Sequence, residues 1–270
     1  MPLPYHAGKA FLSKEISDIV LKEANKNENI KNYAEPFCGM MRVGLEVMKK
    51  SEEDKLFKKF YFSDVNKTIT VFFKELHRGW LPRVSVVTQD KWESYKKSDA
   101  VSAQKTFVGY SFGFGGQYFG GSKPRQKPYT KTFSAEWQKN YLKNRKEVIK
   151  ELQHHFTSSK FSIKEKSVFD LDFKNTIIYC DPPYITTAWR AKTKWDEESE
   201  EQFWDTVYKW LEPSKNNIVL VSNSEKHKRV EGLSIRTVFK KDHISQGSYR
   251  AFGDDRKRSE MLFKITRKQS

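Results

Sequence analysis

Short runs of consecutive apolar residues alternate with amphipathic segments along much of this chain, and this alternation restricts the fold more than any other feature. Thr176–Cys180 and Ile218–Val221 are two such runs. The segment between them places Phe203, Val207 and Leu211 at helical spacing. Strands that are apolar on both faces and alternate with helices are typical of a parallel sheet covered on both sides. The sequence therefore predicts a doubly wound α/β fold, in which ligands bind at the carboxyl ends of the strands.

The same alternation is predicted near the N-terminus. Residues 11–22 read as a helix, and a first strand ends near Tyr33-Ala34. A second helix buries Val43, Val47 and Met48, and a second strand, Phe60–Ser63, leads to Asp64. Acidic residues thus follow both strands, Glu35 after the first and Asp64 after the second.

Residues 67–165 interrupt this rhythm. They contain a Gly/aromatic stretch, Tyr110–Gly121, and a helix predicted to begin near the N-cap residue Ser134. Residues 101–165 carry twelve Lys and Arg against four Asp and Glu, which is half of the net charge of +16. Such an excess indicates a polyanionic partner, most commonly a nucleic acid. We expect 67–165 to be an inserted, mainly helical nucleic-acid-binding domain, with 1–66 and 166–270 forming the sheet domain.

Cysteine usage and hydropathy indicate the cellular setting. Cys38 and Cys180 are the two cysteines, too few for a disulfide framework and without the spacing of a zinc site. No long apolar run marks the N-terminus as a signal peptide or a membrane helix. We expect an intracellular protein located wherever its nucleic acid is, with no metal and no membrane partner.

The sharpest local signal is Asp181-Pro182-Pro183-Tyr184, directly after the predicted strand Thr176–Cys180. The exocyclic amine of a nucleobase is a poor nucleophile because its lone pair is delocalised into the ring. Hydrogen bonds from this amine to the Asp181 carboxylate and the Pro182 carbonyl would localise the lone pair, and successive prolines restrict the loop. Tyr184 offers a face for the base, worth about 1–3 kcal/mol in single-strand binders. The alternative is an ordinary Asp-Pro-Pro turn, but the position at a strand's carboxyl end favours function.

Several motifs, in one order, resemble those of the Dam-type (alpha-group) adenine DNA methyltransferases, including their compact phage and large-DNA-virus members. Pro4–Lys9 resembles the family's aromatic-x-Gly-Gly-Lys element, and Glu35-Pro36-Phe37-Cys38-Gly39 resembles its Glu-Pro-Phe-x-Gly cofactor turn. Asp64 matches the acidic residue that binds the cofactor's ribose hydroxyls, and Asp181–Tyr184 matches the catalytic tetrapeptide. Phe114-Gly115-Gly116 with the basic run after it resembles the target-recognition insert.

The resemblance implies a Rossmann-like methyltransferase sheet and a reaction in which S-adenosylmethionine methylates the 6-amino group of adenine, leaving S-adenosylhomocysteine. Double-stranded DNA is the implied partner. We also expect a cognate restriction endonuclease that acts separately, and a monomer or weak dimer. Catalytic roles are implied for Asp181, Pro182, Pro183 and Tyr184. Cofactor-binding roles are implied for Tyr5, Gly8, Lys9, Glu35, Pro36, Phe37, Gly39, Asp64 and Asp181.

Two motifs depart from the family pattern. His6-Ala7 stands where two small residues are usual, and Met40-Met41-Arg42 replaces a glycine-rich continuation. Gly39 alone must then allow the backbone to approach the cofactor closely. Alternative roles also exist, because Asp64 could be a helix N-cap and Lys9 a solvated lysine at a helix start.

An adenine amine inside a duplex is out of reach, so the nucleotide must be flipped out. Tyr118 and Phe119 are candidate wedges, and Lys123, Arg125 and Lys127 are candidate phosphate or guanine contacts. Lys139 is a further DNA-binding candidate on the predicted helix. The alternatives are packing of Tyr118 and Phe119 inside the insert, and a solvated helix face around Lys139.

Two other functions remain open from the sequence. Related tetrapeptides also serve cytosine amines, RNA adenines and glutamine amides, so the acceptor could differ. A catalytically silent, methyltransferase-like DNA-binding protein is the other alternative, although the presence of Tyr5, Lys9, Asp64 and Asp181 argues against it.

Overall fold

The computed structural model describes residues 3, 9, 12–52, 54–83, 86–113, 116–120, 135–183, 195–223, 230–244 and 257–268 of the 270-residue chain. The strands are β1 Asn32–Glu35, β2 Lys59–Asp64, β3 Phe161–Glu165, β4 Thr176–Cys180, β5 Ile218–Asn223, β6 Leu233–Ile244 and β7 Lys257–Arg267. The α-helices are α1 Ser13–Ala24, α2 Arg42–Ser51, α3 Lys67–His77, α4 Gln89–Lys97, α5 Ala103–Ser111, α6 Ala135–Ser158 and α8 Glu197–Trp210. Two short 3₁₀ turns, η3 Val168–Asp170 and η5 Pro213–Lys215, precede β4 and β5 respectively.

The strands form one seven-stranded mixed sheet in the order β3-β2-β1-β4-β5-β7-β6. The five strands from β3 to β5 are parallel, and β7 runs antiparallel to both β5 and β6. The chain proceeds from β1 towards β3 on one side and resumes with β4 on the other side of β1. This reversal is the topological switch point at which doubly wound sheets bind ligands. The predicted α/β class is confirmed.

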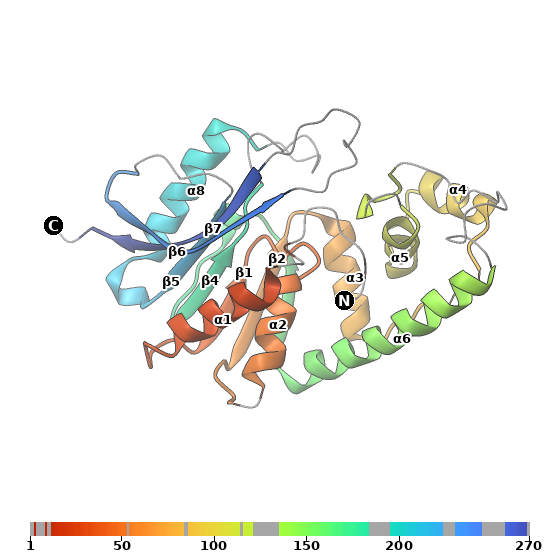
Figure 1. The fold of residues 1–270 in the computed structure, drawn as a ribbon, viewed down its shortest axis with the longest axis horizontal. Coiled ribbons are helices and arrows are strands. Elements are labelled where there is room, and N and C mark those ends of the chain that lie inside the picture. Colours follow the sequence, from red (N-terminus) through yellow and green to blue (C-terminus); the bar gives the residue numbers. More distant parts are fainter. Residues whose placement is uncertain are drawn as a thin grey trace.

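Two groups of buried residues cover the two faces of the sheet, and β4 contributes to both. Ile177 and Tyr179 belong to the core beneath α1, α2 and α3, whereas Ile178 and Cys180 pack with residues of α8. Successive side chains of a strand point to opposite faces, so a strand with five buried residues in a row must be covered on both. Figure 1 shows α1 and α2 in front of the sheet and α8 beyond it.

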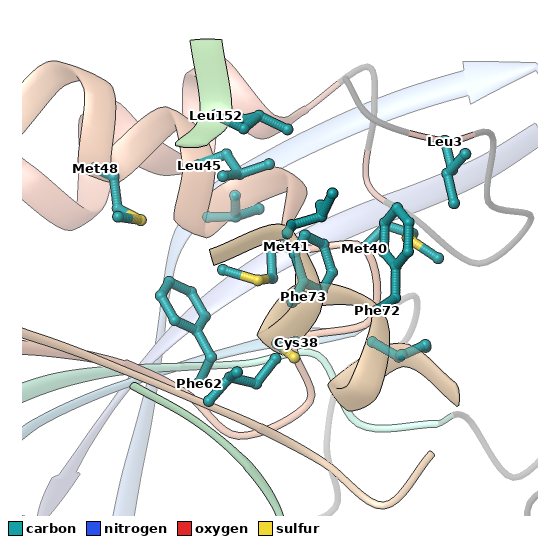
Figure 2. Packing of buried hydrophobic residues seen from close by; sticks show 14 of the residues in the cluster. Leu3, Cys38, Met40, Met41, Leu45, Met48, Phe62, Phe72, Phe73 and Leu152 are labelled. Atoms are coloured by element: carbon teal, nitrogen blue, oxygen red, sulfur yellow. The ribbon is translucent and has the colours of Figure 1, made fainter. Parts of the chain in front are cut away.

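Met40 and Met41, which stand where the family pattern is glycine-rich, face the core. Met40 and Met41 are 1% and 0% exposed, and they pack in the same cluster as Cys38, Phe72 and Phe73 (Figure 2). Gly39 and Met41 both have positive φ, of 45° and 54°, which forms the sharp turn before α2 begins at Arg42. The buried side chains of the two methionines therefore hold the turn against the core. Gly39 is then the small residue at which the backbone of the turn is accessible.

The middle of the chain is helical, with α4, α5 and the 24-residue α6 extending to one side of the sheet (Figure 1). α6 begins at Ala135, as the N-cap prediction indicated, and its Leu152 joins the core near Leu45 (Figure 2). The predicted range 67–165 also includes β3, which is the edge strand of the sheet. This strand has a polar, half-exposed sequence without an apolar run, and the boundaries of the insert stay a prediction.

No helix among the described residues combines the length and apolar character needed to cross a membrane.

Candidate active site at the carboxyl edge of the sheet

Three acidic residues end up at one edge of the sheet because the strands that carry them are parallel neighbours. Glu35 is the last residue of β1, Asp64 is the last of β2, and Asp181 directly follows β4. β1 pairs with both β2 and β4. The sequence prediction that these side chains follow three strands is therefore confirmed, and the sheet places them together.

Asp64 joins the end of β2 to the turn after β1. The backbone N–H of Gly39 donates to Oδ2 at 2.9 Å, and that of Asn66 donates to Oδ1 at 2.8 Å. Burial raises the pKa of Asp64, and the two backbone hydrogen bonds partly oppose this rise. The N-cap of α3 is Asn66, whose Oδ1 accepts from the N–H of Thr68 at 3.0 Å, so the N-cap role considered for Asp64 belongs to the residue two positions later.

Glu35 lies beneath the same turn. Its side chain is 3% exposed and accepts hydrogen bonds from the Tyr33 hydroxyl, at 3.0 Å, and from the N–H of Gly44 in α2. Burial raises the pKa of Glu35 well above its usual range, and the nearby charge of Asp181 acts in the same direction. A Cβ on Gly44 would lie 2.4 Å from Oε2 of Glu35 and 2.3 Å from Cε1 of Phe62. Only glycine therefore lets α2 approach β1 this closely.

Asp181 meets a buried lysine. The Nζ atom of Lys9 lies 3.3 Å from Oδ1 of Asp181 and 2.8 Å from Oε2 of Glu260 on β7. Burial by itself lowers the pKa of Lys9, but the charges of Asp181 and Glu260 outweigh it, and the pKa is raised above its ordinary value. At 8% exposure, Lys9 does not fit the solvated role considered from the sequence.

Glu260 is the residue that sequence reasoning missed. It lies 251 positions from Lys9 and belongs to no recognisable motif. Val65, next to Asp64, was also not singled out, although it is 60% exposed and is thus an unusual large apolar side chain on the surface. The sequence signal that could have identified Val65 is its position as an apolar residue directly after the acidic residue that ends a strand.

The remaining residues of the predicted motifs have different positions. Pro36 and Pro182 are buried, while Phe37 and Pro183 are half-buried. The Phe37 ring packs edge-on against Trp195 and Phe203, so it fastens the turn to the start of α8. Tyr5, Gly8, Tyr184, Lys123, Arg125 and Lys127 lie outside the described residues.

The two candidate wedges differ in exposure. Phe119 is 7% exposed, its ring packs edge-on against Trp92, and its N–H bonds the carbonyl of Gly109 at 3.0 Å. Tyr118 is half-buried beside Tyr110, and burial raises its pKa to about 12. These contacts favour the packing alternative for Phe119 and leave part of Tyr118 accessible. Lys139 is exposed on α6.

Cys38 and Cys180 are both buried thiols. Within the part of the chain that the structure describes, no group of His, Cys, Asp and Glu side chains is arranged to hold a metal ion.

Residues 114–246 match the model of one protein family, described as the D12 class N6 adenine-specific DNA methyltransferases. The matched segment contains Asp181–Tyr184, whereas Lys9, Glu35 and Asp64 precede it. A comparison with curated proteins gives no match.

Several solved structures are distantly similar to the fold. The rRNA methyltransferase aviRa from Streptomyces viridochromogenes is 11% identical with a TM-score of 0.43, over 93% of this chain and 84% of that one. The magnesium protoporphyrin IX methyltransferase ChlM from Synechocystis PCC 6803, with bound SAM, is 8% identical with a TM-score of 0.38, over 94% and 79%. The precorrin-6y C5,15-methyltransferase from Geobacter metallireducens GS-15 is 8% identical with a TM-score of 0.38, over 94% and 89%.

Proposed function

We propose that this protein is a site-specific DNA methyltransferase that transfers a methyl group from S-adenosylmethionine to the 6-amino group of adenine. The observation that carries the proposal is the position of Asp181-Pro182-Pro183 at the carboxyl end of β4, beside the turns that hold Glu35 and Asp64. The family-model match over residues 114–246 includes the tetrapeptide Asp181–Tyr184 and supports adenine as the acceptor base.

The turn around Asp64 fits the ribose of the cofactor. A carboxylate has about four lone-pair sites. Each Asp64 oxygen accepts a backbone hydrogen bond, Oδ2 from Gly39 and Oδ1 from Asn66. Sites on both oxygens are therefore left for two vicinal hydroxyls, as in dinucleotide-binding folds. The exposed side chain of Val65 supplies an apolar surface on which the cofactor's adenine can lie. Gly39, with its positive φ and no Cβ, allows the backbone to come close.

The charge of this edge also suits the cofactor. The chain is strongly basic overall, yet Asp64, Asp181 and Glu260 lie at this edge, with Lys9 paired to the last two. S-adenosylmethionine, when bound, supplies an electrophilic methyl group on a positively charged sulfonium. A surplus of carboxyl groups favours that cation over the neutral product of transfer, S-adenosylhomocysteine.

Asp181 and Pro182 prepare the acceptor amine. The carboxylate of Asp181 accepts one N–H of the amine and the carbonyl of Pro182 accepts the other, so the nitrogen lone pair becomes available for in-line displacement. Positioning provides most of the rate enhancement, and no covalent enzyme intermediate is needed. The ammonium of Lys9, 3.3 Å away, favours the ionised form of Asp181 that this role requires.

The helical insert supplies the DNA-binding surface in this proposal. Its contacts to phosphates or guanine come from Lys123, Arg125, Lys127 and Lys139. Tyr184, the last residue of the tetrapeptide, stacks on the flipped base. Tyr118 is a better wedge than Phe119 because Phe119 is buried against Trp92. A companion restriction endonuclease and a monomeric or weakly dimeric state stay predictions.

The proposal is tested by incubating the protein with tritiated S-adenosylmethionine and either unmethylated duplex DNA or RNA of the same sequence. We expect label in the duplex DNA, and none with Asp181→Ala. The control is Asp172→Ala, which removes a carboxylate just before β4 that is 70% exposed and pairs with Lys215 at 2.8 Å. Near wild-type labelling by Asp181→Ala would refute the catalytic assignment.

Two other outcomes would change the function itself. If label were found only in RNA, the acceptor would be RNA in place of duplex DNA. A protein that binds DNA but shows no thermal stabilisation by S-adenosylmethionine would be a methyltransferase-like DNA-binding protein without the reaction.

A further inference from the structure

The Lys9 ammonium lies between carboxylates from two strands that are not neighbours. β5 separates β4 from β7 in the sheet, with Cys180 opposite Val221 and Asn223 opposite Met261. Glu260 is therefore one residue beyond the paired end of β5, on the same edge as Asp181. The ammonium spans this gap at 2.8 Å from Glu260 and 3.3 Å from Asp181.

All three side chains are largely buried, at 8% exposure for Lys9, 17% for Asp181 and 15% for Glu260. A buried ammonium is costly unless it is paired, and the penalty is offset here by two carboxylates. Both also keep the pKa of Lys9 high against the opposing effect of burial.

The unequal distances have a chemical consequence. The shorter contact, to Glu260, draws the ammonium away from the Asp181 carboxylate, which in the proposed reaction must accept a hydrogen bond from the target amine. Without the Glu260 charge, the ammonium of Lys9 would be drawn closer to Asp181. It would then compete with the amine for the same oxygen.

We propose that Glu260 is a positioning residue for methyl transfer: it holds Lys9 beside Asp181 at a distance from which the ammonium does not displace the acceptor amine from the carboxylate. This inference rests on the proposed function. Glu260 touches Lys9 and acts on the reacting atoms only through it.

The test is Glu260→Gln, which keeps the shape and an acceptor oxygen but removes the charge. The first readout is the pKa of Lys9. It is measured by NMR across pH on protein labelled at the lysine Cε carbons, and the Lys9 signal is assigned by its absence in Lys9→Met. We expect a lower pKa for Lys9 in Glu260→Gln. Glu35 and Tyr179 also lie in the electrostatic field of Asp181, and both are retained in the variant.

The second readout is the single-turnover rate of methyl transfer at saturating S-adenosylmethionine, measured across pH. We expect a rate about 10- to 100-fold lower, the loss that corresponds to one hydrogen bond between the amine and a charged group. Cofactor affinity should change little, and the alkaline loss of activity should begin at a lower pH. Glu260→Asp retains the charge and should recover part of the rate.

The matched control is Lys264→Met on the same strand. It removes another ion pair of β7, because Nζ of Lys264 lies 2.7 Å from Oε2 of the buried Glu23. This variant should lose stability and keep the wild-type rate and pH profile. If it lost activity as Glu260→Gln does, the effect would be a general weakening of β7 and the positioning role would be overturned.

The two proposals fail in different ways. An active wild type with an equally active Glu260→Gln variant would overturn the role of Glu260 and leave the proposed function intact. A wild type that methylates no DNA would overturn the proposed function. In that case an unchanged Lys9 pKa in Glu260→Gln would show separately that Glu260 does not hold the lysine.

Discussion

The backbone N–H of Gly39 donates a 2.9 Å hydrogen bond to Oδ2 of Asp64, so the turn after β1 and the end of β2 form one unit. The N–H of Cys38 reinforces it by donating to the carbonyl of Ser63 at 3.0 Å. This link fixes the orientation of the Asp64 carboxylate before any ligand arrives. The proposed ribose site is therefore preorganised by the backbone.

Asp64→Ala should weaken the binding of S-adenosylmethionine. Hydrogen bonds to charged groups contribute about 1.5–3 kcal/mol, which corresponds to a Kd roughly 10- to 100-fold higher. Isothermal titration calorimetry measures this directly. Asp172→Ala serves as the control, because its carboxylate pairs with Lys215 on the surface and should not affect affinity. Equal affinity in both variants would exclude Asp64 from the cofactor site.

Glu35→Gln should stabilise the fold increasingly as pH rises. The pKa of Glu35 is raised on folding, so its contribution to stability is complete below its unfolded pKa and is lost as pH rises through the folded pKa. Glutamine stays neutral and can still accept from Tyr33 and Gly44. A gain of about 1 kcal/mol corresponds to roughly 2–4 °C in Tm.

Thermal unfolding of wild type and Glu35→Gln at pH 5 and pH 8 checks this expectation. The Tm difference should be larger at pH 8. A difference that did not change with pH, or that shrank, would show that the carboxyl group is not held in its neutral form by burial.

Gly44→Ala should destabilise the β1–α2 unit and weaken cofactor binding together. The added Cβ would fall 2.3 Å from Phe62 and 2.4 Å from Glu35, and overpacking of this kind costs about 1–3 kcal/mol. The matched change in the insert is Gly109→Ala, where the Cβ would lie 2.5 Å from Cε2 of Tyr118. That variant should lose comparable stability and retain cofactor affinity. Calorimetric unfolding and cofactor titration on both variants separate the two effects.

Neutralising Lys123, Arg125 and Lys127 to glutamine should weaken DNA binding and flatten its salt dependence. Each lost phosphate contact reduces the slope of log K against log[salt] by about 0.9, so three contacts predict a change of about 2.7. The control with the same charge change is Lys31, Lys58 and Lys59 to glutamine. These exposed lysines lie at the amino ends of β1 and β2, opposite the edge that carries Asp181. Fluorescence anisotropy over a salt series should show the larger change in slope for the insert variant. Equal slopes for the two variants would show that DNA binds elsewhere on the protein.

The sequence alone predicted the strands that are covered on both faces. β4 and β5 are continuous apolar runs because both of their faces are buried, and the acidic ends of β1, β2 and β4 followed from motifs of adjacent residues. β3 was missed because an edge strand needs little apolar surface. Its pattern, Phe-Ser-Ile-Lys-Glu, has a single buried residue.

Contacts between distant segments could not be predicted in the same way. Nothing around Glu260 indicates that antiparallel β7 brings it to Lys9, since the pairing depends on the order of strands in the finished sheet. The burial of Met40 and Met41 could not be predicted from the turn motif either, because the family pattern has glycines where these side chains stand. The sequence left open whether Phe119 is a wedge or a packed side chain, and its contact with Trp92 favours packing.

The most direct test of the central claim is mass spectrometry of the nucleosides released from unmethylated duplex DNA after incubation with the protein and S-adenosylmethionine. The proposed function predicts N6-methyldeoxyadenosine with the wild type and none with Asp181→Ala. Methylated cytosine in its place, or no methylated nucleoside from a protein that binds both the cofactor and DNA, would contradict it.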